Sequence, residues 1–171
     1  MASMIANLGE EAAAQWAAGI LKNMARPPKG SDRDQMKAVA AGVGDLAIVN
    51  TYYVGKLLNS PDSLERKVGQ QMGIFFPNQE GRGTHINVSG AGVAKYAPNK
   101  ANAIKFIEFL SSAAAQEIFS SSNFEYPVNT NVKISPLLQS WGTFKEDKLS
   151  LSTLGVLNKS AVLLFDQVGW K

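Results

Sequence analysis

The chain has 171 residues, of which 45% are hydrophobic and 18% are charged, and both proportions are ordinary for a globular protein. The absence of cysteine excludes disulfides, cysteine-ligated zinc, iron–sulfur clusters and a thiol nucleophile. The net charge is +3, but Lys and Arg are scattered along the chain, so we expect no nucleic-acid partner. No stretch is long and apolar enough to predict a membrane span.

Residues 5–24 predict two helical pieces that meet at Gly9, since glycine commonly ends a helix. The two glutamates that follow Gly9 suit the first turn of the second helix, where negative charge is favourable. Trp16, Ile20 and Met24 recur at helical spacing. We expect them to form one apolar face.

Ser31 and Asp34 have the spacing of a capping box, in which each side chain bonds the backbone of the other residue. The helix that they begin is expected to run from 32 to about 41 and to bury Met36, Val39 and Ala40. Residues 45–49 then form a short apolar run that predicts a buried strand. This order of helix and strand favours an α/β fold over a helical bundle.

Another helix is expected to begin directly after that strand, capped by Asn50 or Thr51 and ending near Leu58. Its first turn carries Tyr52 and Tyr53, and in open α/β sheets ligands bind beyond the carboxyl ends of strands. Adjacent residues on a helix diverge by about 100°. One interpretation is therefore structural, with one phenol in a core and the other half-exposed.

The second interpretation is a metal site. Ionising a phenol at neutral pH costs roughly 4 kcal/mol, because its reference pKa is about 10. Two adjacent phenolates would cost about 8 kcal/mol, twice that amount. Only a hard, strongly Lewis-acidic cation offsets such a cost, and ferric iron is the biological candidate.

The second half of the chain predicts further strands at 72–77 and 84–89, and an amphipathic helix over 98–110. A helical piece is expected to start at Ser111 or Ser112, and a last helix covers 157–168. His85 is the only histidine, and we expect it to have a structural or surface role. With no Gly-x-Ser-x-Gly motif, a serine hydrolase is not expected.

Residues 50–54, Asn-Thr-Tyr-Tyr-Val, resemble the tyrosine pair of the ferric-iron-binding proteins of bacterial ABC importers. The similarity is greatest to the cyanobacterial FutA/IdiA branch. Residues 5–11, 90–99 and 164–171 resemble the same family, so the likeness runs along the whole chain. It covers only the C-terminal half of such a protein, since family members are about twice as long and bind their ligand between two lobes.

The resemblance implies a partial type II periplasmic-binding-protein-like α/β fold, with helices packed on mixed sheets and the first half missing. It assigns 1–76 to one lobe, resembling the C-terminal lobe, and 84–125 to the other, while 127–171 returns to the first lobe. Residues 124–128 resemble a crossing between lobes, where Tyr126 is expected to lie at a hinge. Tyr96 lies away from the metal in the family pattern, so we expect it to be structural.

The implied function is binding of ferric iron (Fe3+), without catalysis, by Tyr52 and Tyr53 as phenolate ligands. The implied partners are ABC permease subunits in the membrane, and the missing N-terminal half or a second copy of the chain. The implied compartment is the periplasm, although residues 1–4 show no signal peptide. Two alternatives stay open: a fragment that binds an anion or another small solute, and a truncated piece that only associates with its missing half.

Overall fold

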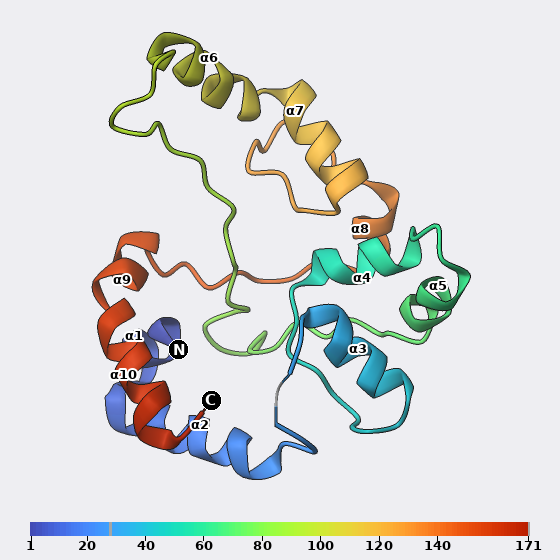
Figure 1. The fold of residues 1–171 in the computed structure, drawn as a ribbon, viewed down its shortest axis with the longest axis vertical. Helices are drawn as coiled ribbons and strands as arrows, with labels where there is room; N and C mark the ends of the chain where they lie inside the picture. Colours follow the sequence, from blue (N-terminus) through green and yellow to red (C-terminus); the bar gives the residue numbers. More distant parts are fainter. Residues whose placement is uncertain (28, 171) are drawn as a thin grey trace. The chain divides into compact units, whose positions relative to one another are not determined.

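The computed structural model describes residues 1–27 and 29–170, and most of its regular structure is helical (Figure 1). Among the described residues, no helix could cross a membrane, since none is long and apolar enough. In chain order the helices are α1 (Ala2–Leu8), α2 (Glu10–Asn23), α3 (Asp32–Ala40), α4 (Thr51–Leu58), α5 (Ser63–Gln70), α6 (Lys100–Leu110), α7 (Ala113–Ile118), the π-helix η1 (Phe119–Asn123), α8 (Pro136–Ser140), α9 (Leu151–Val156) and α10 (Asn158–Val168).

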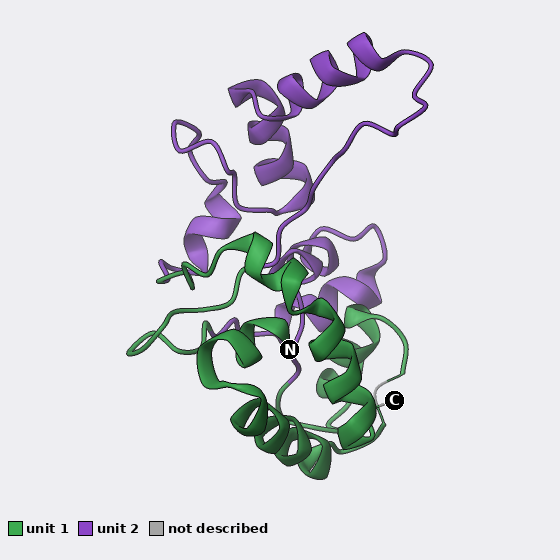
Figure 2. Cartoon of the chain, turned by 90° about the vertical axis from the view of Figure 1, so that its left-hand side faces the viewer, with its two compact units in different colours: residues 1–46, 76–86, 145–171 green, residues 47–75, 87–144 purple. Residues whose placement is uncertain are grey.

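These helices belong to two compact units (Figure 2). Unit 1 comprises residues 1–46, 76–86 and 145–171, and unit 2 comprises 47–75 and 87–144. Both units are assembled from segments that are distant in sequence. The boundaries of these units do not test the predicted lobes. The assignment of 1–76 and 127–171 to one lobe and of 84–125 to the other therefore stays a prediction.

The predicted starts and ends of helices are confirmed where a capping side chain or glycine carries them. Gly9 ends α1 with φ of 83°, and α2 begins at the next residue. Asp34 Oδ2 accepts hydrogen bonds from the backbone N–H and the hydroxyl of Ser31, at 2.7 Å and 2.9 Å, which completes the capping box. The Ser112 hydroxyl accepts from the N–H of Ala115 and starts α7.

The predicted strands at 45–49, 72–77 and 84–89 are wrong for this chain. Within 1–27 and 29–170 the pairing is limited to one isolated parallel bridge between Thr84 and Glu146. A strand is held by hydrogen bonds to a neighbouring strand, and an apolar sequence pattern does not supply that neighbour. The helices of the expected α/β fold are therefore present without the mixed sheets on which they were expected to pack.

The segment 45–49 is also not buried, as we had expected. Leu46 is 91% exposed and Ile48 is 76% exposed, whereas Ala47 and Val49, which alternate with them, are half-buried. Phe75, in the second of these segments, is 83% exposed. Alternating exposure is the pattern of an extended segment with only one face covered. These segments thus keep the alternating character of strands, and Leu46, Ile48 and Phe75 are exposed.

In unit 1, the core forms where α1, α2 and α10 meet. Its buried side chains are Ile5, Ala13, Ala17, Ala161 and Leu164. The small alanines let the helices approach closely, and α2 and α10 lie side by side (Figure 1). The predicted apolar face of α2 is correct only in part: Ile20 and Met24 are half-buried, but Ala13 and Ala17 form its buried centre and Trp16 is 39% exposed.

A buried carboxylate joins three parts of unit 1. Asp147 Oδ2 accepts hydrogen bonds from the Ser3 hydroxyl at 3.2 Å and from Asn7 Nδ2 at 3.0 Å. Arg82 Nε lies 3.8 Å from the same oxygen, and Asp147 Oδ1 accepts from the backbone N–H of Leu149. A buried charge is tolerated when such partners replace its water. Asp147 therefore connects α1 to the segments 76–86 and 145–149.

In unit 2, α4 packs closely against α5, whereas α6 has no buried residue. Leu57 of α4 is fully buried, and the backbone of Leu57 and Leu58 approaches Gly69 so closely that a Cβ there would lie 2.8 Å from the Leu58 nitrogen. Buried Gln116 connects α7 to the backbone on both sides, donating to the Leu110 carbonyl and accepting from the N–H of Val128. The packing of unit 2 thus involves α4, α5 and α7 together with η1 and α8, which bury Ser120 and Leu138.

We predict that Gly83→Ala destabilises unit 1 more than Gly42→Ala. Both glycines have positive φ, of 95° and 74°, so either substitution forces an unfavourable backbone conformation worth about 1–2 kcal/mol. A Cβ at Gly83 would also lie 2.6 Å from the backbone of Glu146, whereas a Cβ at Gly42 meets nothing within 4 Å. Urea unfolding should show an additional loss of about 1–3 kcal/mol for Gly83→Ala. Equal losses would contradict the close approach of 76–86 to 145–149.

Candidate metal-binding site

Tyr52 and Tyr53 lie on the first turn of α4, which begins at Thr51 as predicted. The preceding residue, Asn50, has an extended backbone with φ of −76° and ψ of 134°, the conformation typical of a helix N-cap. Its side-chain oxygen accepts a hydrogen bond from Asn87 Nδ2 at 3.0 Å. The tyrosine pair is therefore placed at a helix start whose entry is joined to a second segment of unit 2.

The two phenol rings lie together instead of diverging. Their centroids are 4.2 Å apart and their planes are tilted by 33°, and both residues are half-buried. Our structural interpretation, with one ring in a core and the other directed elsewhere, is thus wrong. Side-chain rotation has brought adjacent positions of the helix onto a common patch, where ring–ring contact contributes about 0.5–1.5 kcal/mol.

Lys56 lies one turn further along α4 and places its ammonium over both rings. The Nζ atom is 4.9 Å from the ring centroid of Tyr52 and 5.9 Å from that of Tyr53. Both distances are within the range of about 6 Å in which a cation is attracted to the face of an aromatic ring. The site thus holds a positive charge beside its two phenols.

The position of α4 is fixed by a tight contact between Gly55 and Phe124. Gly55 is buried, and a Cβ placed on it would lie 2.4–2.7 Å from the Cβ and ring atoms of Phe124. Phe124 ends the π-helix η1 in a left-handed conformation with φ of 60°, which is uncommon for a residue other than glycine. The ring of Phe124 therefore sets the position of the helix that carries the tyrosines.

The structure brings together two phenols, whose oxygens can serve as donors to a hard cation. Within the described parts of the chain, no three His, Asp or Glu side chains gather closely enough to hold a metal ion. Two phenolates fit ferric iron chemically, since oxygen donors suit hard cations. Two donors are an incomplete set for an ion that takes about six, so the assignment of Tyr52 and Tyr53 as ligands stays a prediction.

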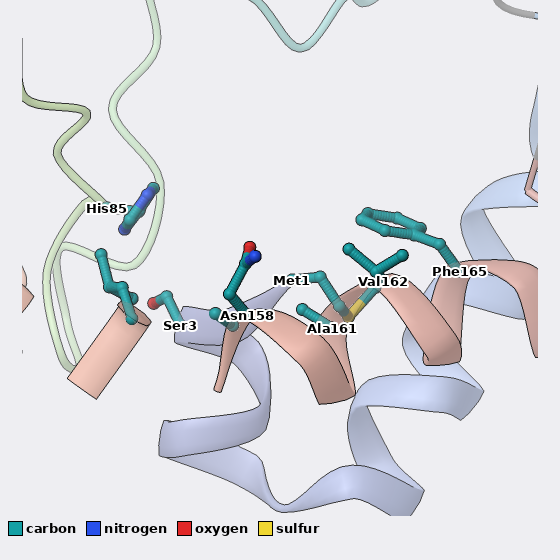
Figure 3. Close-up of a pocket in the computed structure, with 9 residues that line it drawn as sticks. Met1, Ser3, His85, Asn158, Ala161, Val162 and Phe165 are labelled. Atoms are coloured by element: carbon teal, nitrogen blue, oxygen red, sulfur yellow. The ribbon is translucent and has the colours of Figure 1, made fainter. Parts of the chain in front are cut away.

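A separate cavity of about 250 Å³ lies in unit 1, and its walls are mostly apolar (Figure 3). It is lined by Met1, Ala2, Ser3, His85, Leu154, Asn158, Ala161, Val162 and Phe165. Burial lowers the pKa of the His85 imidazole, as does the amino group of Met1, while Asp147 acts in the opposite direction. His85 is partly exposed at this cavity, which agrees with the surface role expected for it.

The two remaining tyrosines differ in environment. Tyr96 is 85% exposed, so the structural role predicted for it is not seen in this chain. Tyr126 packs edge-on against Phe144, with ring centroids 5.2 Å apart. Its hydroxyl is buried without a hydrogen-bond partner among the described residues, and burial raises the pKa of this phenol. Its predicted position at a hinge stays a prediction.

Comparison with known proteins gives the class of this chain. The family described as bacterial extracellular solute-binding protein matches residues 4–146, and the chain belongs to this family. The chain is 47% identical over 171 residues to iron uptake protein A1 of Synechocystis sp., covering all of this chain and 48% of that protein. It thus spans about half the length of the curated relatives that it matches.

Solved structures of ferric-binding proteins share this fold. A ferric binding protein from Campylobacter jejuni matches with a TM-score of 0.96 and 45% identity, over 99% of this chain and 54% of that one. A Trichodesmium IdiA/FutA protein, solved with iron and citrate, matches with a TM-score of 0.92 and 50% identity, over 99% of this chain and 54% of that one. The predicted family resemblance is thereby confirmed, and the similarity extends over almost the whole chain.

We predict that Gly55→Ala destabilises unit 2 by about 1–3 kcal/mol, because the rigid ring of Phe124 cannot yield to an added methyl group. The loss should appear although alanine favours helices over glycine by about 1 kcal/mol. Gly73→Ala is the matched control in the same unit, since a Cβ at Gly73 meets nothing within 4 Å. Urea unfolding monitored by tyrosine fluorescence gives the comparison, and a Gly55→Ala chain as stable as the control would exclude the tight contact.

Proposed function

We propose that this chain is the part of a ferric-iron-binding protein of an ABC importer that carries the metal-binding tyrosines. Tyr52 and Tyr53 each supply one phenolate oxygen to Fe3+. The observation that carries the proposal is the gathering of both phenol rings on one patch, 4.2 Å apart, at the start of α4. The similarity to iron uptake protein A1 and to ferric-binding structures supports the same cargo.

The energetics favour a trivalent cation over weaker competitors. Ionising both phenols costs about 8 kcal/mol at neutral pH, twice the cost for one reference phenol. The helix N-terminus offsets roughly 0.3–1 kcal/mol of this cost, because it stabilises negative charge. The ammonium of Lys56 also attracts the phenolates. These contributions are much smaller than the cost, so the metal itself must offset most of it. Ferric iron is the ion whose affinity for phenolate is high enough.

The proposed mechanism is closure of two lobes around the bound ion. In this scheme 1–76 and 127–171 belong to one lobe, 84–125 belongs to the other, and Tyr126 lies at a crossing between them. Closure follows when the cargo binds the closed state more tightly than the open state. Permease subunits in the membrane then recognise the closed form in the periplasm. The ion is carried unchanged, so the protein needs no catalytic group.

The remaining ligands are proposed to lie in the part of the protein that this chain does not include. The chain spans 48% of the length of iron uptake protein A1, which leaves room for a comparable segment. The exposed side chains of α6, including Phe106 and Phe109, would be covered by that segment or by a second copy of the chain. Apolar surface of this kind is typical of an interface.

We predict that Tyr52→Phe and Tyr53→Phe each weaken or abolish the visible charge-transfer band that phenolates give with ferric iron. The variants should be made in the full-length protein, meaning the longest product of the reading frame that encodes this chain. Each substitution removes one ligand oxygen and keeps the ring, so the packing of α4 is retained. Titration with chelated ferric iron provides the measurement. Tyr96→Phe is the matched control, and wild-type bands in both site variants would rule out the assignment.

We predict that the 171-residue chain alone binds ferric iron far more weakly than the full-length protein. The ionisation cost of about 8 kcal/mol is unchanged, while fewer metal–ligand bonds offset it. A citrate-competition titration of both proteins side by side measures the difference. Equal affinities would mean that the missing ligands are replaced. Repeating the titration at several protein concentrations would then show whether a second copy supplies them, since only dimer formation depends on concentration.

A further inference from the structure

The arrangement of the tyrosine pair requires an interaction that holds the rings together. Positions 52 and 53 diverge by about 100° around α4, yet the ring centroids are only 4.2 Å apart. Half-buried side chains lose rotamer freedom when they are kept in one arrangement, which opposes such a pair. The ring–ring contact alone contributes modestly. A further group that contacts both rings would make this arrangement the favoured one before any metal arrives.

Lys56 is that group. It lies four residues after Tyr52 and three after Tyr53, the two spacings that bring side chains together on a helix. Its Nζ lies over both rings, 4.9 Å and 5.9 Å from their centroids. An ammonium donates only and has no lone pair for a metal, so Lys56 cannot itself be a ligand. Because Lys56 contacts the faces of both rings, it can orient the two candidate ligands without binding the metal.

We propose that Lys56 is a positioning residue that holds Tyr52 and Tyr53 together in the metal-free protein and so prepares both phenols for the ferric ion. This inference rests on the proposed function and adds a determinant of affinity to it. A site whose ligands are already held in place loses less conformational entropy when the ion binds. Without the ammonium, the two rings would move apart, because positions 52 and 53 point in different directions around α4. Metal binding would then have to bring the two phenols together again.

The chain offers a matched control for a lysine that contacts a tyrosine ring. Lys95 Nζ lies 5.3 Å from the centroid of the Tyr96 ring, so this pair has similar geometry in the same unit. Tyr96 is not part of the proposed site. Lys95→Met therefore removes an equivalent charge and cation–ring contact while leaving the candidate ligands untouched.

The first measurement uses the metal-free full-length protein. In the wild type, the ε-methylene protons of Lys56 should show an upfield NMR shift from the two ring currents, and near-ultraviolet circular dichroism should report the paired tyrosines. Lys56→Met should reduce the tyrosine signal, while Lys56→Arg should preserve it, since a guanidinium also stacks on aromatic rings. Lys95→Met should leave the signal of the pair unchanged. An unaltered signal in Lys56→Met would overturn the proposal.

The second measurement is ferric-iron affinity by citrate competition. We expect Lys56→Met to weaken binding about five- to thirtyfold, corresponding to two lost cation–ring contacts, and Lys56→Arg to restore most of it. Lys95→Met should change affinity by less than about twofold. Wild-type affinity in Lys56→Met would contradict a role in positioning. Equal loss in Lys56→Met and Lys95→Met would also contradict it, because the effect would then follow from net charge alone.

The two proposals fail in distinguishable ways. Tyr52→Phe and Tyr53→Phe remove the ligand oxygens but retain both rings, so the metal-free signal of the pair should persist in those variants. If they keep the wild-type iron band, the proposed function is wrong, whatever Lys56 does. If they lose the band while Lys56→Met keeps both the metal-free signal and the affinity, the function stands and the positioning role is wrong.

Discussion

The pairing requirement of β-structure determines how much of this chain is organised. A helix satisfies its backbone hydrogen bonds within one segment, whereas an extended segment needs a neighbour to receive its N–H and C=O groups. The helices of this chain therefore form from local sequence, and the extended segments at 45–49 and 72–77 remain without ladders. Both compact units are held by helix contacts and by buried side-chain hydrogen bonds, and unit 1 also has an isolated bridge between Thr84 and Glu146.

The candidate site lies in the better packed part of unit 2. The ring of Phe124 presses on Gly55 from one side of α4, and α5 packs against the same helix near Leu57. Tyr52, Tyr53 and Lys56 lie on the same helix and are half-buried. This arrangement suits a ligand site, because partly accessible side chains are carried by a helix that packing holds in place.

Local signals predicted much of the helical structure. The glycine at position 9, the Ser31–Asp34 pair and Ser112 mark helix ends through interactions within a few residues, and the tyrosine helix was predicted over its observed range. The family resemblance predicted from the sequence motifs agrees with the comparisons. The short helix α9 was not predicted, since its composition gives no strong periodic signal.

Other features depend on partners that the sequence pattern does not reveal. An apolar run such as 45–49 indicates what a segment can bury, and Leu46 is exposed because no described segment covers it. The stacking of Tyr52 on Tyr53 depends on side-chain rotation, which helix periodicity does not determine. The contact of Lys56 with both rings could have been suspected from its spacing of three and four residues, whereas Phe124 against Gly55 joins distant positions without any local signal.

The acceptor role of Asp147 has a consequence for the order in which the molecule is assembled. Ser3 and Asp147 are separated by 144 positions, and all of unit 2 lies between them in sequence. During synthesis, the hydroxyl of Ser3 and the amide of Asn7 are made long before the carboxylate that binds them. Closing so long a loop costs entropy, although this cost grows only slowly with the length of the loop. The first helix of unit 1 can therefore form its hydrogen bonds to Asp147 only after the last quarter of the chain has been synthesised.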